Sequence, residues 1–185
     1  GGTLCIGAKW FGEKERIFLS DWTDGHVEML KGIHKLLSEA DAVITYNGDK
    51  FDLPKINGEF ILNGIKPVAP VTSIDLIKTV RKFGFDMNRL GFVGPLLGLG
   101  DKVKHEGFRL WSLVMEGDKK AQLRMQKYCL QDVVLTEALY KKVRPFIRNH
   151  PHLGETKSKA CGACGSHHVQ SRGYRRTKAF KVQRL

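Results

Sequence analysis

Apolar residues gather in four short runs that are rich in strand-forming side chains. Residues 3–10 (TLCIGAKW) and 16–19 (RIFL) are separated by a glycine and several charges, so we expect them to form a hairpin. Residues 42–46 (AVITY) resemble a buried strand, and residues 71–76 (VTSIDL) indicate a short fourth strand or a strand end.

Between these runs the spacing of apolar residues becomes helical. Residues 24–41 predict a helix that is capped by Thr23 or Asp24. Its expected inward face consists of Val27, Leu30, His34 and Leu37. A second helix is expected to open at Pro54 and to end at Gly64. Its expected inward face consists of Ile56, Phe60 and Ile61.

The strongest helical pattern begins at Asp118 and is stopped by Pro145. It predicts one long helix, or two that join near Tyr128. A hairpin followed by strands interleaved with helices favours an α/β fold. We expect this fold to occupy residues 1–148, because the composition changes beyond that point.

The C-terminal part of the chain differs from the rest in composition. Residues 149–160 are polar and poor in apolar side chains, which suits a linker. Residues 161–185 carry a dense share of positive charge and are too few to form a core without a metal. We expect a partial zinc-ribbon element with a basic tail there.

Charge indicates the class of partner. The 185 residues include 31 Lys and Arg against 19 Asp and Glu, so the net charge is +12. This balance favours a polyanionic partner, with nucleic acid first, over a merely basic surface. No apolar run approaches the roughly 18 residues of a membrane span, and no signal peptide is evident at the start. We expect a cytoplasmic protein without membrane contact, while the sequence does not indicate protein partners.

The four cysteines fall into two groups. Cys5 and Cys129 lie in apolar stretches and are expected to be buried thiols. Cys161 and Cys164 form a C-x-x-C pair, which in an intracellular chain more often indicates metal or redox chemistry than a structural disulfide.

The C-x-x-C pair resembles the first knuckle of a zinc ribbon, in which two thiolates bind one Zn²⁺. A tetrahedral site needs two further ligands, of which His167 or His168 could supply one. No second C-x-x-C follows in the sequence, so an ordinary pair of reduced thiols stays open. A thioredoxin-like redox pair is less favoured, because the surrounding residues are glycine-rich and basic.

A single carboxylate stands just beyond the buried strand, in the segment NGDKFDLP at residues 47–54. Asp52 lies two residues before Pro54 and could serve only as a helix cap. The same position could also direct the carboxylate towards a metal. The local sequence leaves both interpretations open.

Tyr128 and Asp132 are four residues apart, so on a helix their side chains project from the same face. Leu130 and Val133 give Asp132 apolar neighbours, among which an unpaired carboxylate would be costly. A tyrosine one turn before an aspartate can orient or deprotonate a water held by a metal that the aspartate binds. The alternative is a solvent-facing aspartate on an amphipathic helix.

Three segments together resemble the second and third motifs of a known family. They are the strand with N-G-x-x-F-D-L-P at residues 47–54, S-I-D-L at residues 73–76 and Y-x-x-x-D at residues 128–132. Over about residues 3–145 the chain is similar to the DnaQ-like, DEDD-type 3′-to-5′ exonucleases, in the subtype with a tyrosine in the third motif. The order and spacing of the motifs make the resemblance more specific than any motif alone.

The resemblance implies a ribonuclease H-like fold with a mixed central sheet and two Mg²⁺ or Mn²⁺ ions. It further implies that Asp52 and Asp132 are metal-site carboxylates and that Tyr128 positions the attacking water. Asn47 and Phe51 would line the path of the terminal nucleotide, most simply at the 3′ end of a single strand. The implied reaction is phosphodiester hydrolysis, with DNA favoured over RNA.

The first motif of that family, D-x-E on an opening strand, has no match in this sequence. We therefore expect the first strand to be missing from the N-terminal end. Two carboxylates cannot by themselves offset the +4 charge of two divalent ions. A nucleic-acid-binding module that keeps the fold but has lost the chemistry is accordingly the alternative function.

Overall fold

The computed structural model describes residues 2–102, 107–151, 168, 174–176 and 181–183. The chain divides into two compact units, Gly1–Phe146 and Ile147–Leu185. In the second unit, β5 (Tyr174–Arg176) and β6 (Lys181–Gln183) form an antiparallel pair. The predicted zinc ligands Cys161 and Cys164 lie outside the described residues, so the zinc-ribbon element stays a prediction, as do the linker and tail boundaries.

The first unit contains two pairs of strands. β1 (Cys5–Ala8) and β2 (Ile17–Ser20) form the predicted antiparallel hairpin. β3 (Ala42–Thr45) and β4 (Thr72–Asp75) lie parallel, with Thr45 opposite Asp75. The connection between β3 and β4 runs through helix α3 (Asp52–Leu62), as parallel strands require a crossover. The predicted α/β class is therefore confirmed.

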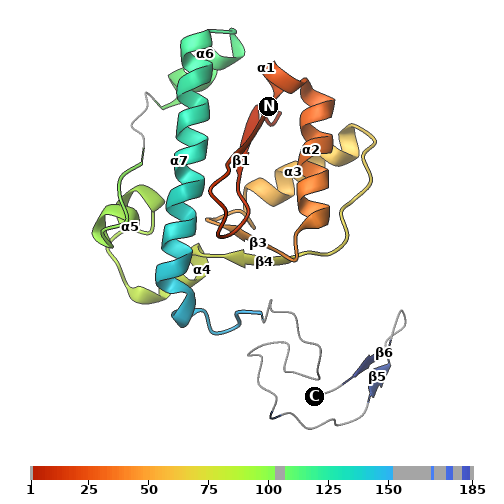
Figure 1. Cartoon of the computed structure of the whole chain (residues 1–185), viewed down its shortest axis with the longest axis vertical. Helices are drawn as coiled ribbons and strands as arrows, with labels where there is room; N and C mark the ends of the chain where they lie inside the picture. The colour runs from red at the N-terminus through yellow and green to blue at the C-terminus, as the bar shows by residue number, and fades with distance from the viewer. Residues whose placement is uncertain (1, 103–106, 152–167, 169–173, 177–180, 184–185) are drawn as a thin grey trace. The chain divides into compact units, whose positions relative to one another are not determined.

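The two strand pairs do not join. Among the described residues, β1 pairs only with β2 and β3 only with β4, so each of these strands is hydrogen-bonded along one edge. The described strands of the expected mixed sheet therefore form two small sheets, one antiparallel and one parallel. Both sheets lie beside the same long helix, α7 (Figure 1).

The remaining helices enclose these sheets. Their bounds are α1 (Asp21–Asp24), α2 (His26–Glu39), α4 (Ile77–Val80), the 3₁₀ turn η1 (Arg81–Phe83), α5 (Leu90–Leu96), α6 (Phe108–Met115), α7 (Lys119–Val143) and the 3₁₀ turn η2 (Arg144–Phe146). The sequence pattern does not predict α6, whereas α7 is the single long helix expected before Pro145. Within the described residues, no helix is both long and apolar enough to cross a membrane.

Helix α7 is the central packing element, since it contacts β1, β2, β3, α5 and α6. Two groups of buried side chains lie on either side of the hairpin. One group joins α6 to α7 and consists of Leu110, Val114, Ala121 and Met125. The other joins α2 to α3 and consists of Met29, Leu30, Ile33, Ile56 and Phe60.

The expected start and inward face of α2 are partly wrong. Thr23 and Asp24 belong to the short helix α1, and α2 follows Gly25, whose φ of 83° redirects the chain. This later start brings Met29, Leu30 and Ile33 to the core and leaves Val27 43% exposed. In α3, Ile61 is likewise 80% exposed rather than inward, because Ile56 and Phe60 already fill the buried face.

β1 approaches α7 closely at Gly7. A Cβ atom there would lie 3.0 Å from the carbonyl oxygen of Cys129, so a side chain would push the strand from the helix. The Sγ atoms of Cys5 and Cys129 are 3.7 Å apart, and both thiols are half-buried rather than fully buried as expected. Their hydrogen bond lowers the pKa of Cys5 and, together with burial, raises the pKa of Cys129.

A polar network ties the hairpin to the C-terminal half of α7. Glu137 forms ion pairs with Lys9 and with Lys141, whose Nζ lies 2.9 Å from Oε1, and it accepts the backbone N–H of Gly12 at 3.1 Å. Burial alone would raise the pKa of Glu137, but these three partners lower it to about 2. The ionised carboxylate is therefore favoured by the folded state.

We expect Glu137→Gln to lower the free energy of unfolding at pH 7 by on the order of 2 kcal/mol. The pKa of Glu137 in the folded state lies below the ordinary 4.5. The extra free energy of unfolding of the wild-type protein over the variant should therefore be complete above pH 4.5 and should decrease as the pH drops towards about 2. Urea denaturation across this range measures it. Glu39→Gln, which removes a surface pair with Lys35 at 4.0 Å, should show a small effect, and equal effects would contradict the network's role.

Candidate active site

Three polar side chains meet beside the middle of α7. Tyr128 and Asp132 project from one face of the helix, and Lys102 reaches both of them from the segment after α5. The Nζ atom of Lys102 lies 2.7 Å from Oδ2 of Asp132 and 3.3 Å from the hydroxyl of Tyr128. It also lies 5.0 Å from the centre of the Tyr128 ring, within range of a cation–π contact. Sequence reasoning missed Lys102.

The carboxylate of Asp132 is only half satisfied. Its Oδ2 atom pairs with Lys102, whereas Oδ1 is buried and has no hydrogen-bond partner among the described residues. A buried, unpaired carboxylate oxygen costs free energy unless a donor or a cation reaches it. The predicted alternative of a solvent-facing aspartate does not describe this position, since the side chain of Asp132 is only 24% exposed.

Tyr128 is held in place by its neighbours. Its ring meets that of Trp111 edge to face, with centroids 6.0 Å apart. Burial and the charge of Asp132 raise the pKa of the phenol. Tyr128 is therefore protonated at neutral pH, so its hydroxyl can hold a water by hydrogen bonding but is a poor proton acceptor there.

The segment that carries Asp52 is organised by another aspartate. Asp75, at the end of β4, is buried and accepts the backbone N–H groups of Asn47 at 2.6 Å and Asp49 at 3.3 Å. Asn47 has a positive φ of 67°, which turns the chain out of β3. Asp75 stands within the S-I-D-L motif, but sequence reasoning missed this structural role. The only signal for it is an acid at the end of an apolar strand.

Asp52 is the first residue of α3, and Phe51 is the residue before the helix. The side chain of Asp52 is exposed, yet the surrounding protein and the charge of Asp75 raise its pKa. The Phe51 ring is 57% exposed, with the Nζ atom of Lys50 5.5 Å from its centre. An exposed aromatic ring at this place is available for stacking with a base.

The two predicted metal ligands lie on neighbouring elements. Asp132 is on α7, which packs against β3, and Asp52 follows the loop at the end of β3 (Figure 1). Their approach to one cluster stays a prediction. The described residues contain no group of three His, Cys, Asp or Glu side chains able to hold a metal. Oδ1 of Asp132 nonetheless fits a hard cation, which prefers carboxylate oxygen.

The family model of the RNase H superfamily matches residues 3–144. The chain belongs to the RNase H superfamily. A solved structure with a similar fold is the family B DNA polymerase from the hyperthermophilic archaeon Pyrobaculum calidifontis, at a TM-score of 0.60 and 18% identity. The match covers 71% of this chain and 20% of the polymerase, so the chain corresponds to about a fifth of that protein's length. No curated protein matches the chain.

Membership of the RNase H superfamily confirms the ribonuclease H-like fold implied by the motifs. It also fits the two strand pairs and the long packing helix that the structure shows. The finer assignment to the DnaQ-like subtype rests only on the segments that resemble the second and third motifs.

Replacing Lys102 by Met should destabilise this RNase H domain by about 1–3 kcal/mol at neutral pH, because Asp132 would then lose its cation. Adding Asp132→Asn to that variant should recover most of the loss. Urea denaturation measures both changes. Lys127→Met on the exposed side of the same helix is the matched control and should change stability by less than about 0.5 kcal/mol. A Lys102→Met protein as stable as the control would contradict the ion pair's contribution.

Proposed function

We propose that the chain is a nuclease domain that removes nucleotides from the 3′ end of a single-stranded nucleic acid, with DNA favoured. The observation that carries the proposal is the half-satisfied carboxylate of Asp132 next to the fixed hydroxyl of Tyr128. This pair lies in a domain of the RNase H superfamily, whose members typically use divalent metals.

Two further observations support an exonuclease of the DnaQ-like type that acts on DNA. The segments that resemble the second and third motifs occur in the order and spacing of the tyrosine subtype. The similar solved structure is a DNA polymerase, which favours DNA over RNA as the substrate.

In this proposal Asp52 and Asp132 would hold Mg²⁺ or Mn²⁺. Such ions lower the pKa of a bound water and neutralise charge that develops on the phosphate. Tyr128 orients the attacking water through its protonated hydroxyl. Phe51 stacks on the terminal base, and Asn47, fixed through its backbone by Asp75, contacts the terminal nucleotide.

A zinc site in the C-terminal unit is a separate part of the proposal. Cys161 and Cys164 would supply two thiolates to Zn²⁺, which prefers such ligands in structural sites. The basic residues around them would then be presented on a small metal-stabilised element.

A nucleic-acid-binding module without hydrolysis is the second candidate function. Two observations favour it. The described residues bring no three metal-ligating side chains together, and Lys102 already neutralises part of Asp132. Two carboxylates leave half of the +4 charge of two divalent ions to be balanced by the phosphate and by other ligands.

The deciding experiment incubates the 185-residue chain with a 5′-labelled single-stranded DNA and Mn²⁺. The proposal predicts products that shorten stepwise from the 3′ end, and Asp132→Asn should abolish them. Tyr128→Phe keeps the ring and should lower the turnover number by about 10² to 10⁴. An unchanged turnover number would make Tyr128 a packing residue.

Products from internal cleavage would contradict the exonuclease assignment. Binding of the DNA without any products would favour the second candidate over the nuclease. EDTA serves as the control, because it should stop hydrolysis but leave binding that depends only on positive side chains.

A further inference from the structure

A row of basic side chains on α7 leads to the proposed active site. Lys120, Arg124, Tyr128 and Asp132 follow one another at intervals of four residues, so each shares a face with the next, while the whole row winds by about a third of a turn around the helix. Lys127 borders this row. Lys120, Arg124 and Lys127 are all exposed, and we call these three residues the α7 basic stripe. From Lys120 to Asp132 the row extends about 18 Å along the helix.

One lysine of the stripe is unfavourably placed for the helix itself. The N-terminal end of a helix carries partial positive charge, which disfavours a basic side chain in the first turn, where Lys120 lies. The nearest acid, Asp118, caps the helix by accepting the N–H of Ala121 at 2.7 Å. No acidic residue occurs between Lys119 and Gln131 in the sequence. Neither the helix dipole nor an acid within this stretch of α7 therefore stabilises Lys120 and Lys127.

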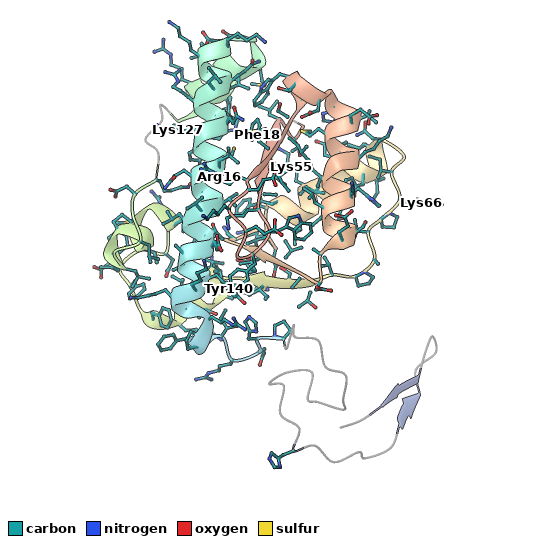
Figure 2. All side chains as sticks on the ribbon, in the orientation of Figure 1. Arg16, Phe18, Lys55, Lys66, Lys127 and Tyr140 are labelled. Carbon is teal, nitrogen blue, oxygen red and sulfur yellow. The ribbon has the colours of Figure 1, made fainter. Side chains whose placement is uncertain are left out.

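Several lysines elsewhere in the described structure are paired with acids. Lys31 lies 2.7 Å from Glu28, and Lys141 lies 2.9 Å from Glu137. Lys120 and Lys127, in contrast, form no ion pair with any described residue. Figure 2 shows Lys127 on the side of α7 away from the hairpin, with Lys66 at the opposite edge of the domain. An anionic partner would supply the missing counter-charge.

We propose that the α7 basic stripe binds the backbone phosphates of single-stranded DNA and guides the strand to Tyr128 and Asp132. This inference rests on the proposed function and deepens it, because the same strand would end at the active site. The three cations occupy a narrow sector of one helix, which suits a single phosphate backbone, and they lie in the turns of α7 that precede Tyr128 and Asp132. The nucleotides that contact the stripe are those upstream of the terminal one.

The test compares two double variants that remove the same charge. Lys120→Gln/Lys127→Gln removes two members of the stripe, and Lys35→Gln/Lys66→Gln removes two exposed lysines elsewhere. Glutamine retains a helix propensity close to that of lysine, so both proteins should keep their fold. Thermal denaturation checks that they do.

Binding of the whole chain to a 5′-labelled single strand is measured by fluorescence anisotropy over a range of salt concentrations in EDTA. For a single strand, each phosphate that the protein no longer neutralises reduces the slope of log K against log salt by about 0.7. We expect the slope of the stripe variant to fall by about 1.4 and that of the control to fall much less. A dinucleotide too short to reach the stripe should bind both variants equally.

Equal slopes for the two variants would contradict binding of single-stranded DNA by the α7 basic stripe. A slope that the stripe variant reduces only with duplex DNA would contradict it as well. If the wild-type chain binds no single strand, both the stripe and the proposed function fail. If the stripe effect is present but Mn²⁺ supports no hydrolysis, the stripe stands and only the nuclease proposal fails. The outcomes therefore separate the two proposals.

Discussion

The packing of α7 against both strand pairs is the constraint on which the rest of the domain depends. The two sheets share no hydrogen-bonded strand among the described residues, and α7 contacts strands of both. Gly7 permits β1 to lie directly on the helix backbone at Cys129. Glu137 anchors the same hairpin further along the helix through Lys9. The position of Tyr128 and Asp132 relative to the strands follows from this packing.

Two aspartates near the strands have different roles. Asp75 uses its oxygens to accept backbone N–H groups, which fixes the turn between β3 and α3. Asp132 keeps one oxygen without a partner in the described structure, and Lys102 pairs with the other. Both oxygens of Asp75 are engaged by backbone donors, whereas one oxygen of Asp132 is open to a further donor or cation.

Much of the fold could be predicted from local patterns. The hairpin, the strand before Asn47 and the long helix ending before Pro145 each carry a strong periodic or terminal signal. Helix α6 lacks such a signal, because its N-cap is Gly107 rather than a residue with a capping side chain. The pattern places Ile61 on the wrong face, since hydrophobic spacing does not reveal which apolar residues find a partner.

The candidate site was predictable only in part, for a related reason. The shared face of Tyr128 and Asp132 follows from helix geometry alone, whereas only tertiary packing brings Lys102 to them from 26 and 30 positions earlier in the chain.

The proposed nuclease function requires that Asp52 and Asp132 bind the same metal cluster. This can be tested by calorimetric titration of Mn²⁺ into the wild-type chain, Asp52→Asn, Asp132→Asn and the double variant. We expect each single change to weaken Mn²⁺ binding and the double change to cost less than the sum, because the ligands act together. Mn²⁺ affinity that is unchanged in either single variant, or losses that simply add, would contradict it.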